Sequence, residues 1–97
     1  VRVLPFGSVV AGALVINATP LGMNGEPLPA GVLGSASGLV DLAYGPVDPP
    51  ATAEARLTGL PLVDGLEFLA LQAGESFTWW TGIAAPLEVM LQAARNG

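Results

Sequence analysis

Three short, mainly apolar runs, each closed by turn-forming residues, indicate where strands form. They are Ala13–Ile16, which Asn-Ala-Thr-Pro ends, Gly38–Tyr44, which Gly-Pro ends, and Leu60–Val63, which Asp-Gly ends. Apolar residues that follow one another without alternation are typical of strands buried on both faces, as in a parallel sheet. We therefore predict three parallel strands.

Helical patterns lie between the second and third runs and again at the end of the chain. Ala51–Leu57 follows two prolines and Asp48, an acid that is a candidate helix cap, and the pattern stops at Gly59. The last helix is predicted over Pro86–Arg95, with apolar residues at three- and four-residue spacing. Its apolar face comprises Leu87, Met90, Leu91 and Ala94.

The strongest helical pattern runs from Gly65 to Thr81. Asp64 and Glu67 form an Asp-x-x-Glu capping pair at its start, and Gly82 supplies a C-terminal stop. The spacing predicts one apolar face made of Leu66, Leu69, Ala70, Ala73, Phe77 and Trp80. We interpret Trp79 and Trp80 as core or interface residues rather than as a place where a cofactor stacks.

Strands that alternate with helices predict parallel β-α-β units. Three strands are about half of a doubly wound nucleotide-binding sheet, and the G-x-G-x-x-G turn that cradles phosphates in such sheets does not occur in the sequence. We therefore expect an α/β fold, a partial Rossmann-like parallel sheet of about three strands with flanking helices. Residues 22–38 read as a long loop with one helical turn around Pro29–Leu33.

The composition predicts more apolar surface than a domain of this size normally exposes to water. The 97 residues are 52% hydrophobic and 11% charged, whereas an average soluble domain carries roughly 25% charged residues. Either another subunit or domain covers this surface, or the chain is a piece of something larger, which we favour. Alone, the chain is expected to self-associate through its sheet edge and apolar faces.

Charge and residue types exclude several classes of function. A net charge of −5 with three scattered arginines provides no basic stripe for nucleic acid. With no Cys and no His, and with acids spread singly, a metal site is not expected. Residues 3–25 carry no charge, but prolines, glycines and asparagines interrupt them, which argues against a membrane span. The lack of Cys and of a signal peptide pattern is compatible with the cytoplasm.

Three motifs carry the candidate chemistry. They are V-I-N-A-T-P-L-G-M from Val15, D-L-A-Y-G-P from Asp41 and V-D-G-L-E-F-L-A-L-Q-A from Val63. In this order and spacing they resemble the C-terminal part of the shikimate dehydrogenase family, over nearly the whole chain. The resemblance implies NADPH-dependent reduction of 3-dehydroshikimate to shikimate, a step of aromatic amino-acid biosynthesis.

The resemblance also implies a division of the chain and a set of contacts. Residues 1–82 correspond to the C-terminal half of the NADP-binding domain, and residues 83–97 to a helix that returns to the substrate domain. The cofactor contacts carried over are Asn17, Ala18, Thr19, Leu42, Gly65 and Phe68, and the substrate contacts are Tyr44 and Gln72. The family's catalytic Lys and Asp lie on the N-terminal substrate domain, and this chain has no Lys, so we expect the chain alone to be inactive.

Taken without the resemblance, the same residues favour simpler roles. Asn17 and Thr19 are typical of a turn before Pro20, a lone tyrosine such as Tyr44 more often packs, and Gln72 more often lies at a solvated helix edge.

The sequence also departs from the family at four places, one of which is Pro49, which stands in place of the Thr of the usual Thr-Pro. Glu67 and Phe68 stand where the family has Gly-Met, and Gly45 stands for the usual Asn. The alternatives are therefore a non-catalytic, self-associating binding domain, or a relative that uses quinate or NAD.

Overall fold

The computed structural model describes residues 1–96, and three parallel strands form its single sheet in the order β1-β2-β3. The elements are β1 (Leu14–Asn17), β2 (Gly38–Asp41), α1 (Pro50–Thr58), β3 (Leu62–Val63), α2 (Gly65–Thr81) and α3 (Leu87–Asn96). In the register, Asn17 lies opposite Asp41, and Leu39 lies opposite Leu62. The predicted α/β class is confirmed. The strands are shorter than predicted, since the second ends at Asp41.

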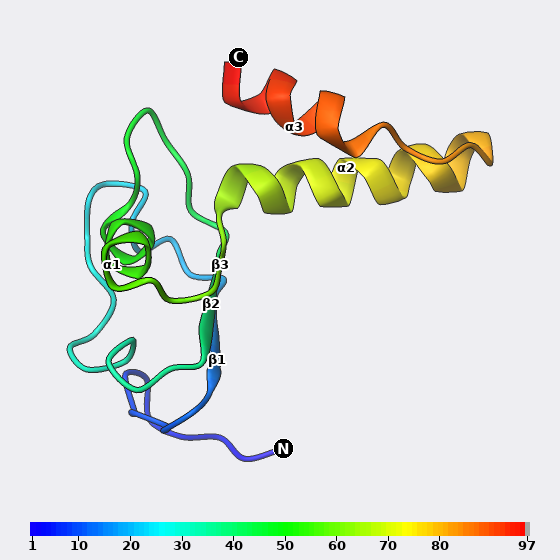
Figure 1. Cartoon of the computed structure of the whole chain (residues 1–97). Coiled ribbons are helices and arrows are strands. Elements are labelled where there is room, and N and C mark those ends of the chain that lie inside the picture. The colour runs from blue at the N-terminus through cyan, green and yellow to red at the C-terminus, as the bar shows by residue number, and fades with distance from the viewer. Residues whose placement is uncertain (97) are drawn as a thin grey trace.

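Helix α1 covers one face of the sheet (Figure 1). The core beneath it consists of Leu33, Leu39, Ala51 and Ala55, with Val15, Leu28, Leu60 and Leu62 packed around them. Pro50 occupies the first turn, where its missing N–H costs nothing, and Gly59 ends the helix in the left-handed conformation at φ 72°. Asp48 does not cap this helix, because the N-cap is Pro49 and Asp48 pairs with Arg56 instead.

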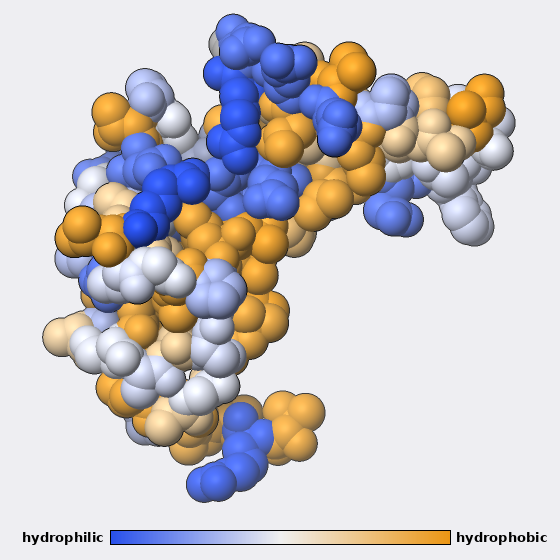
Figure 2. Space-filling view, in the orientation of Figure 1, coloured by the Kyte–Doolittle hydropathy of each residue, from blue (hydrophilic) through white to orange (hydrophobic). Residues whose placement is uncertain are grey.

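The opposite face of the sheet is open, which corrects the expectation of strands buried on both sides. Leu14 and Ile16 point to this face and are 59% and 61% exposed. Figure 2 shows hydrophobic residues gathered along the inner side of the bend between the sheet and α2. The continuous apolar run in β1 thus fits a sheet with two covered faces, of which the residues described here cover one.

Helix α2 has the predicted bounds and leaves the sheet from its first turn, while α3 runs back alongside it (Figure 1). Gly82 ends α2 at φ 71° and begins the reversal. The apolar face predicted for α2 is wrong as a buried face: Ala70 is buried, but Leu69 and Trp80 are exposed. Trp79 and Trp80 are 86% and 81% exposed, so they belong to no core of residues 1–96.

The connection from β1 to β2 consists of successive turns rather than a helix. Val32 donates to Pro29 and Gly34 donates to Gly31 through their backbones, in place of the single helical turn predicted there. In the described residues no helix is both long and apolar enough to cross a bilayer.

Candidate functional site at the carboxyl edge of the sheet

Polar side chains gather where the parallel strands end. Asn17 is the last residue of β1, Asp41 is the last residue of β2, and Asp64 follows β3 directly. Carboxyl ends of parallel strands meet at one edge of a sheet, which is where ligands bind in open α/β folds. All three side chains are buried, so their partners decide what the edge can offer.

The side chain of Asn17 is used entirely within the protein. Its Nδ2 donates to Asp41 Oδ1 and to the carbonyl oxygen of Leu21, both at 3.0 Å. Its Oδ1 accepts from the backbone N–H of Thr19 at 3.1 Å and from Thr19 Oγ1 at 2.6 Å. An amide has two donor hydrogens and two acceptor lone pairs, so Asn17 has none left for a ligand.

Asp41 lies at the centre of this network and is fully buried. Its Oδ1 accepts from Asn17 and from the backbone N–H of Ala43 at 3.1 Å, and its Oδ2 accepts from Thr52 Oγ1 at 2.9 Å. These three donors are neutral and come from β1, the end of β2 and α1. Asp41 therefore ties the covering helix to the sheet.

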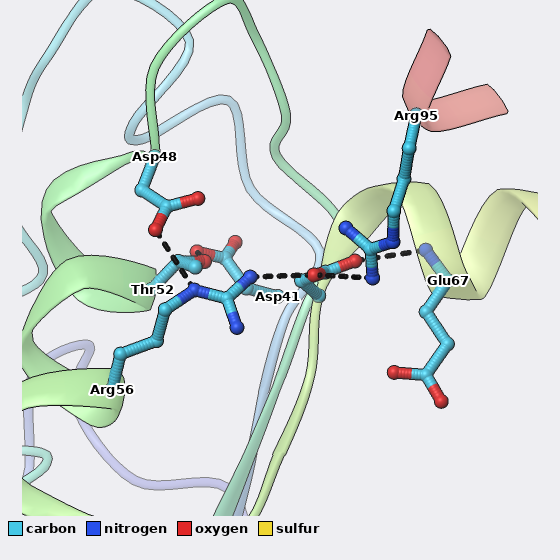
Figure 3. A network of polar contacts seen from close by, with 7 residues as sticks. Asp41, Asp48, Thr52, Arg56, Glu67 and Arg95 are labelled. Carbon is cyan, nitrogen blue, oxygen red and sulfur yellow. Dashed lines mark hydrogen bonds and ion pairs between the residues drawn. The ribbon is translucent and has the colours of Figure 1, made fainter. Parts of the chain in front are cut away.

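Asp64 forms a second polar centre, at the start of α2. Its Oδ1 accepts from the backbone N–H of Glu67 at 2.8 Å, as predicted for a helix cap. Its Oδ2 accepts from Arg56 Nη2 at 2.6 Å and from Arg95 Nη2 at 3.0 Å. In Figure 3 dashed lines lead from both labelled arginines to this carboxylate, which carries no label of its own. Arg56 also donates through Nε to Asp48 at 2.8 Å.

The charges of this centre shift its pKa values in opposite directions. Burial by itself raises the pKa of Asp64, but the Glu67 N–H and the two guanidinium groups outweigh it and hold this pKa below its ordinary value. Hydrogen bonds to Asp64 and then to Asp48 raise the pKa of Arg56. The ion pairs are therefore in place throughout the neutral range.

Gly65 lies tightly against the chain that follows β2. A Cβ at Gly65 would stand 2.5 Å from the carbonyl oxygen of Ala43 and 2.9 Å from the Cβ of Tyr44. This position admits no side chain, and the reason lies within the protein itself. Tyr44 and Gly65 line a small cleft of about 30 Å³ together with Thr52, Asp64 and Arg95.

Phe68 and Gln72 lie elsewhere, along an open groove between α2 and the start of α3. The groove has a volume of about 710 Å³, and Leu71, Gly74 and Leu87 also line it. Gln72 is exposed, as a solvated helix edge predicts, and it faces this groove rather than the cleft beside Tyr44.

The predicted contact residues therefore fall into three groups along the edge. Asn17 and Thr19 border a depression next to β1. The cleft holds Tyr44 and Gly65, and the groove holds Phe68 and Gln72. Ala18 is exposed at the end of β1, and Leu42 is half-buried just after β2.

Sequence reasoning missed the roles of Asp41, Thr52, Arg56 and Arg95. A signal was present for two of them, because Asp41 closes an apolar strand and Thr52 stands on the face of α1 occupied by Ala51 and Ala55. The described residues contain no group of three or more acids that could hold a metal ion, and the chain has no His or Cys.

Comparisons with known proteins match both the sequence and the fold. A family model described as the shikimate 5'-dehydrogenase C-terminal domain matches residues 65–95. The chain is 41% identical over 86 residues to a shikimate dehydrogenase (NADP(+)) of Methanocella arvoryzae, covering 86% of this chain and 32% of that protein. It is 39% identical over 85 residues to the enzyme of the same name from Archaeoglobus fulgidus, covering 84% and 32%. The chain thus spans about a third of the length of these curated relatives.

Solved structures of the same kind superpose on most of the chain. Shikimate 5-dehydrogenase from Thermus thermophilus, solved in complex with NADP(H) and shikimate, gives a TM-score of 0.72 at 36% identity over 86% of this chain and 33% of that one. A chorismate mutase/shikimate 5-dehydrogenase fusion protein from Clostridium acetobutylicum gives 0.71 at 30% identity, over 90% and 35%.

Proposed function

Since this chain belongs to the shikimate dehydrogenase family, as its C-terminal part, we propose that it contributes the nicotinamide side of an NADP-dependent shikimate dehydrogenase. The reaction is reduction of 3-dehydroshikimate to shikimate. The observation that carries the proposal is that each of the three family motifs includes the carboxyl end of a strand, so that all three meet at one edge of a parallel sheet, with Tyr44 and Gly65 in one cleft. We also place the activity in the cytoplasm, in keeping with a chain that has no cysteine.

The residues at this edge fit the nicotinamide end of the cofactor. Both buried carboxylates, Asp41 and Asp64, are turned inward and hydrogen-bonded, so they present no free negative charge to a ligand. What remains at the surface is the small side chain of Ala18 and the half-buried, apolar Leu42. When bound, NADP supplies the ring that exchanges a hydride with the substrate carbon.

Within this proposal, Asn17 and Thr19 contact the cofactor through their backbone groups rather than through their side chains. The side chain of Asn17 is saturated, and Thr19 Oγ1 donates to Asn17 and accepts from the backbone N–H of Leu21. These bonds fix the turn after β1, so that Ala18 and its neighbouring peptide groups face the cofactor in one conformation.

Tyr44 and Gln72 are proposed to hold the substrate from two sides. Tyr44 is 43% exposed and borders the cleft, and Gln72 is exposed and borders the groove, so both side chains are accessible. A phenol O–H and an amide can each donate to and accept from the hydroxyl groups of a polyol acid. The proton-transfer pair belongs to the N-terminal substrate domain, toward which residues 83–97 lead in this proposal, so the chain alone is expected to be inactive.

The alternative of a non-catalytic binding domain rests on Glu67, a carboxylate in place of the usual glycine. The side chain of Glu67 borders a pocket with Leu87, Glu88 and Leu91 on the α3 side of α2, and not the cleft of Tyr44. Its charge is therefore kept off the proposed nicotinamide contact, which favours the enzyme over the alternative.

The test is NADP-dependent oxidation of shikimate by the full natural polypeptide that carries these residues, with quinate and NAD as parallel arms. Gln72→Ala is expected to raise the KM for shikimate by about tenfold, the size of one or two lost hydrogen bonds. Tyr44→Phe is expected to have a similar effect, and Gln92→Ala on the exposed face of α3 is the matched control. An active enzyme whose KM for shikimate is the same in all three variants contradicts the proposed substrate contacts.

A further inference from the structure

The junction between α2 and the sheet is narrow. Of the strands, α2 contacts β2, and its remaining length packs against α3 (Figure 1). Gly65 lies so close to the chain after β2 that a Cβ there would stand 2.5 Å from the carbonyl oxygen of Ala43, and we take this close approach as the pivot of the junction. Contacts at one end of a helix fix the position of that end but constrain the direction of the helix axis less, so we expect other contacts to set that direction.

The Asp64 carboxylate provides those contacts. It connects three separate elements at one point, because Arg56 lies on α1, Arg95 lies near the end of α3, and Asp64 itself caps α2. Figure 3 shows Arg95 reaching down from α3 and Arg56 reaching across from α1. The side chain of Asp64 is 9% exposed, which strengthens both charge-assisted hydrogen bonds relative to a surface pair.

The distribution of arginines along the chain also indicates that Asp64 holds this junction. Three arginines are the chain's only cationic side chains, and two of them meet on Asp64, while Arg2 joins no ion pair in residues 1–96. Asp48 holds the Nε side of Arg56 at 2.8 Å and so fixes the plane of that guanidinium before it meets Asp64. Asp64 thus connects the start of α2 to the sheet through Arg56 on α1. Through Arg95 it also connects to α3, which forms with α2 a helical hairpin of residues 65–96.

We propose that Asp64 is a positioning residue, which through Arg56 and Arg95 sets the angle at which the α2–α3 hairpin leaves the sheet, and with it the spacing of Gln72 from Tyr44. The role of those two residues rests on the proposed function above. The lever is long, because Gln72 lies seven residues beyond Gly65 and a helix rises about 1.5 Å per residue, so a tilt of about 10° moves Gln72 by roughly 2 Å. Misplacement of about 1 Å can cost on the order of 100-fold in rate.

The angle itself can be measured without reference to activity. Spin labels on Ala53→Cys of α1 and Ala73→Cys of α2, both exposed positions, report the distance from the sheet side to the hairpin in the full natural polypeptide. Asp64→Asn keeps a good helix cap but removes the charge. We expect the distance distribution to shift or broaden by about 2 Å in Asp64→Asn and in Arg95→Gln, as the lever estimate implies.

The matched control is Arg2→Gln, which removes the same charge away from the junction and is expected to leave the distribution unchanged. Arg95→Lys keeps the charge without the planar fork and is expected to recover part of the wild-type distribution. Distributions in Asp64→Asn and Arg95→Gln that coincide with that of the wild type overturn the proposal.

Kinetics then separate positioning from mere loss of structure. We expect Arg95→Gln to raise the KM for shikimate by about tenfold while the Kd for NADP changes less than about twofold, because every proposed cofactor contact except Phe68 lies at the pivot or on its sheet side, and Phe68 is only three residues beyond Gly65. Equal losses in both constants overturn the positioning role. A wild-type enzyme without shikimate oxidation refutes the proposed function alone, since the distance measurement still decides whether Asp64 sets the angle.

Discussion

The sheet with α1 and the α2–α3 hairpin are each held in place by a buried carboxylate, but the two carboxylates accept hydrogen bonds from different kinds of donor. On the sheet, Asp41 is fully buried and takes its hydrogen bonds from neutral donors. At the hairpin, Asp64 takes them from two arginines whose side chains are 45% and 42% exposed. The second arrangement responds to pH and ionic strength, because it consists of ion pairs with partly exposed arginines. The sheet with α1 is therefore a fixed platform, to which the α2–α3 hairpin is attached by ion pairs.

The largest effect is expected where the platform is broken. Asp41→Ala leaves the donors of Asn17, Ala43 and Thr52 buried and unpaired, so we expect the free energy of unfolding to fall by about 3–5 kcal/mol. Thr52→Val removes one donor at nearly constant volume and is expected to cost about 1–2 kcal/mol. Urea unfolding followed by circular dichroism measures both. Equal costs for the two variants contradict the central role of Asp41.

The two buried glycines of α2 allow the junction with the sheet and the contact with α3 to be compared within one helix. A Cβ at Gly65 meets the backbone of Ala43, which has no freedom to move, so Gly65→Ala is expected to destabilise by about 2–3 kcal/mol. A Cβ at Gly74 meets the tip of the Leu87 side chain, which can adopt another rotamer, so Gly74→Ala is expected to cost about 1 kcal/mol or less. Thermal unfolding of the two variants decides the order, and the reverse order refutes this account of the pivot.

The ion pairs of Asp64 are expected to make the stability of the fold depend on pH. The pKa of Asp64 in the folded chain lies below its ordinary value of 3.8, so the unfolded chain binds the proton more readily. The stabilising contribution of Asp64 is thus complete above about pH 5 and is lost as the pH falls through the lowered pKa. We expect Asp64→Asn to cost on the order of 1 kcal/mol at pH 7 and progressively less in acid. Unfolding curves of both proteins from pH 7 to pH 2 test this, and a constant difference contradicts it.

Substitutions at the open face of the sheet are expected to change stability the least. They are nevertheless expected to reduce self-association clearly. Ile16 is 61% exposed there, so Ile16→Lys is expected to change the free energy of unfolding by less than about 0.5 kcal/mol and to reduce self-association of the chain alone. Leu57→Lys, at an equally apolar exposed position on α1, is the matched control. Light scattering at rising concentration measures the difference, and equal association of both variants argues against this face.

Local features of the fold could be predicted from the sequence, and long-range ones could not. The start and end of α2 follow from Asp64, Glu67 and Gly82, which act within one or two turns of the helix. The failure at Asp48 has a specific cause: an ion pair with Arg56, eight residues away, took the place of a cap. The apolar face of α2 was misread because burial depends on what covers a helix, and periodicity contains no information on that.

The residues of the candidate site also divide into those that local sequence patterns predict and those that they do not. The motifs located Tyr44, Gly65 and the turn after β1, because each lies at the end of a strand that the apolar runs marked. The partners of Asp41 and Asp64 remained hidden, since Asn17 lies 24 residues from Asp41 and Arg95 lies 31 residues from Asp64. Pairing over such separations is decided by the packing of strands and helices, which spacing along the chain does not specify.

The turn-built connection between β1 and β2 has a consequence for the order of folding. The β2-α1-β3 unit joins its strands through a helix that packs on them as it forms, whereas β1 must be brought to β2 through a long segment without a helix of its own. Closing such a loop carries an entropic cost that no local structure offsets in advance. We expect β2, α1 and β3 to assemble first and β1 to join last, so that the buried bond between Asn17 and Asp41 forms late and the amides of β1 exchange hydrogen fastest among the three strands.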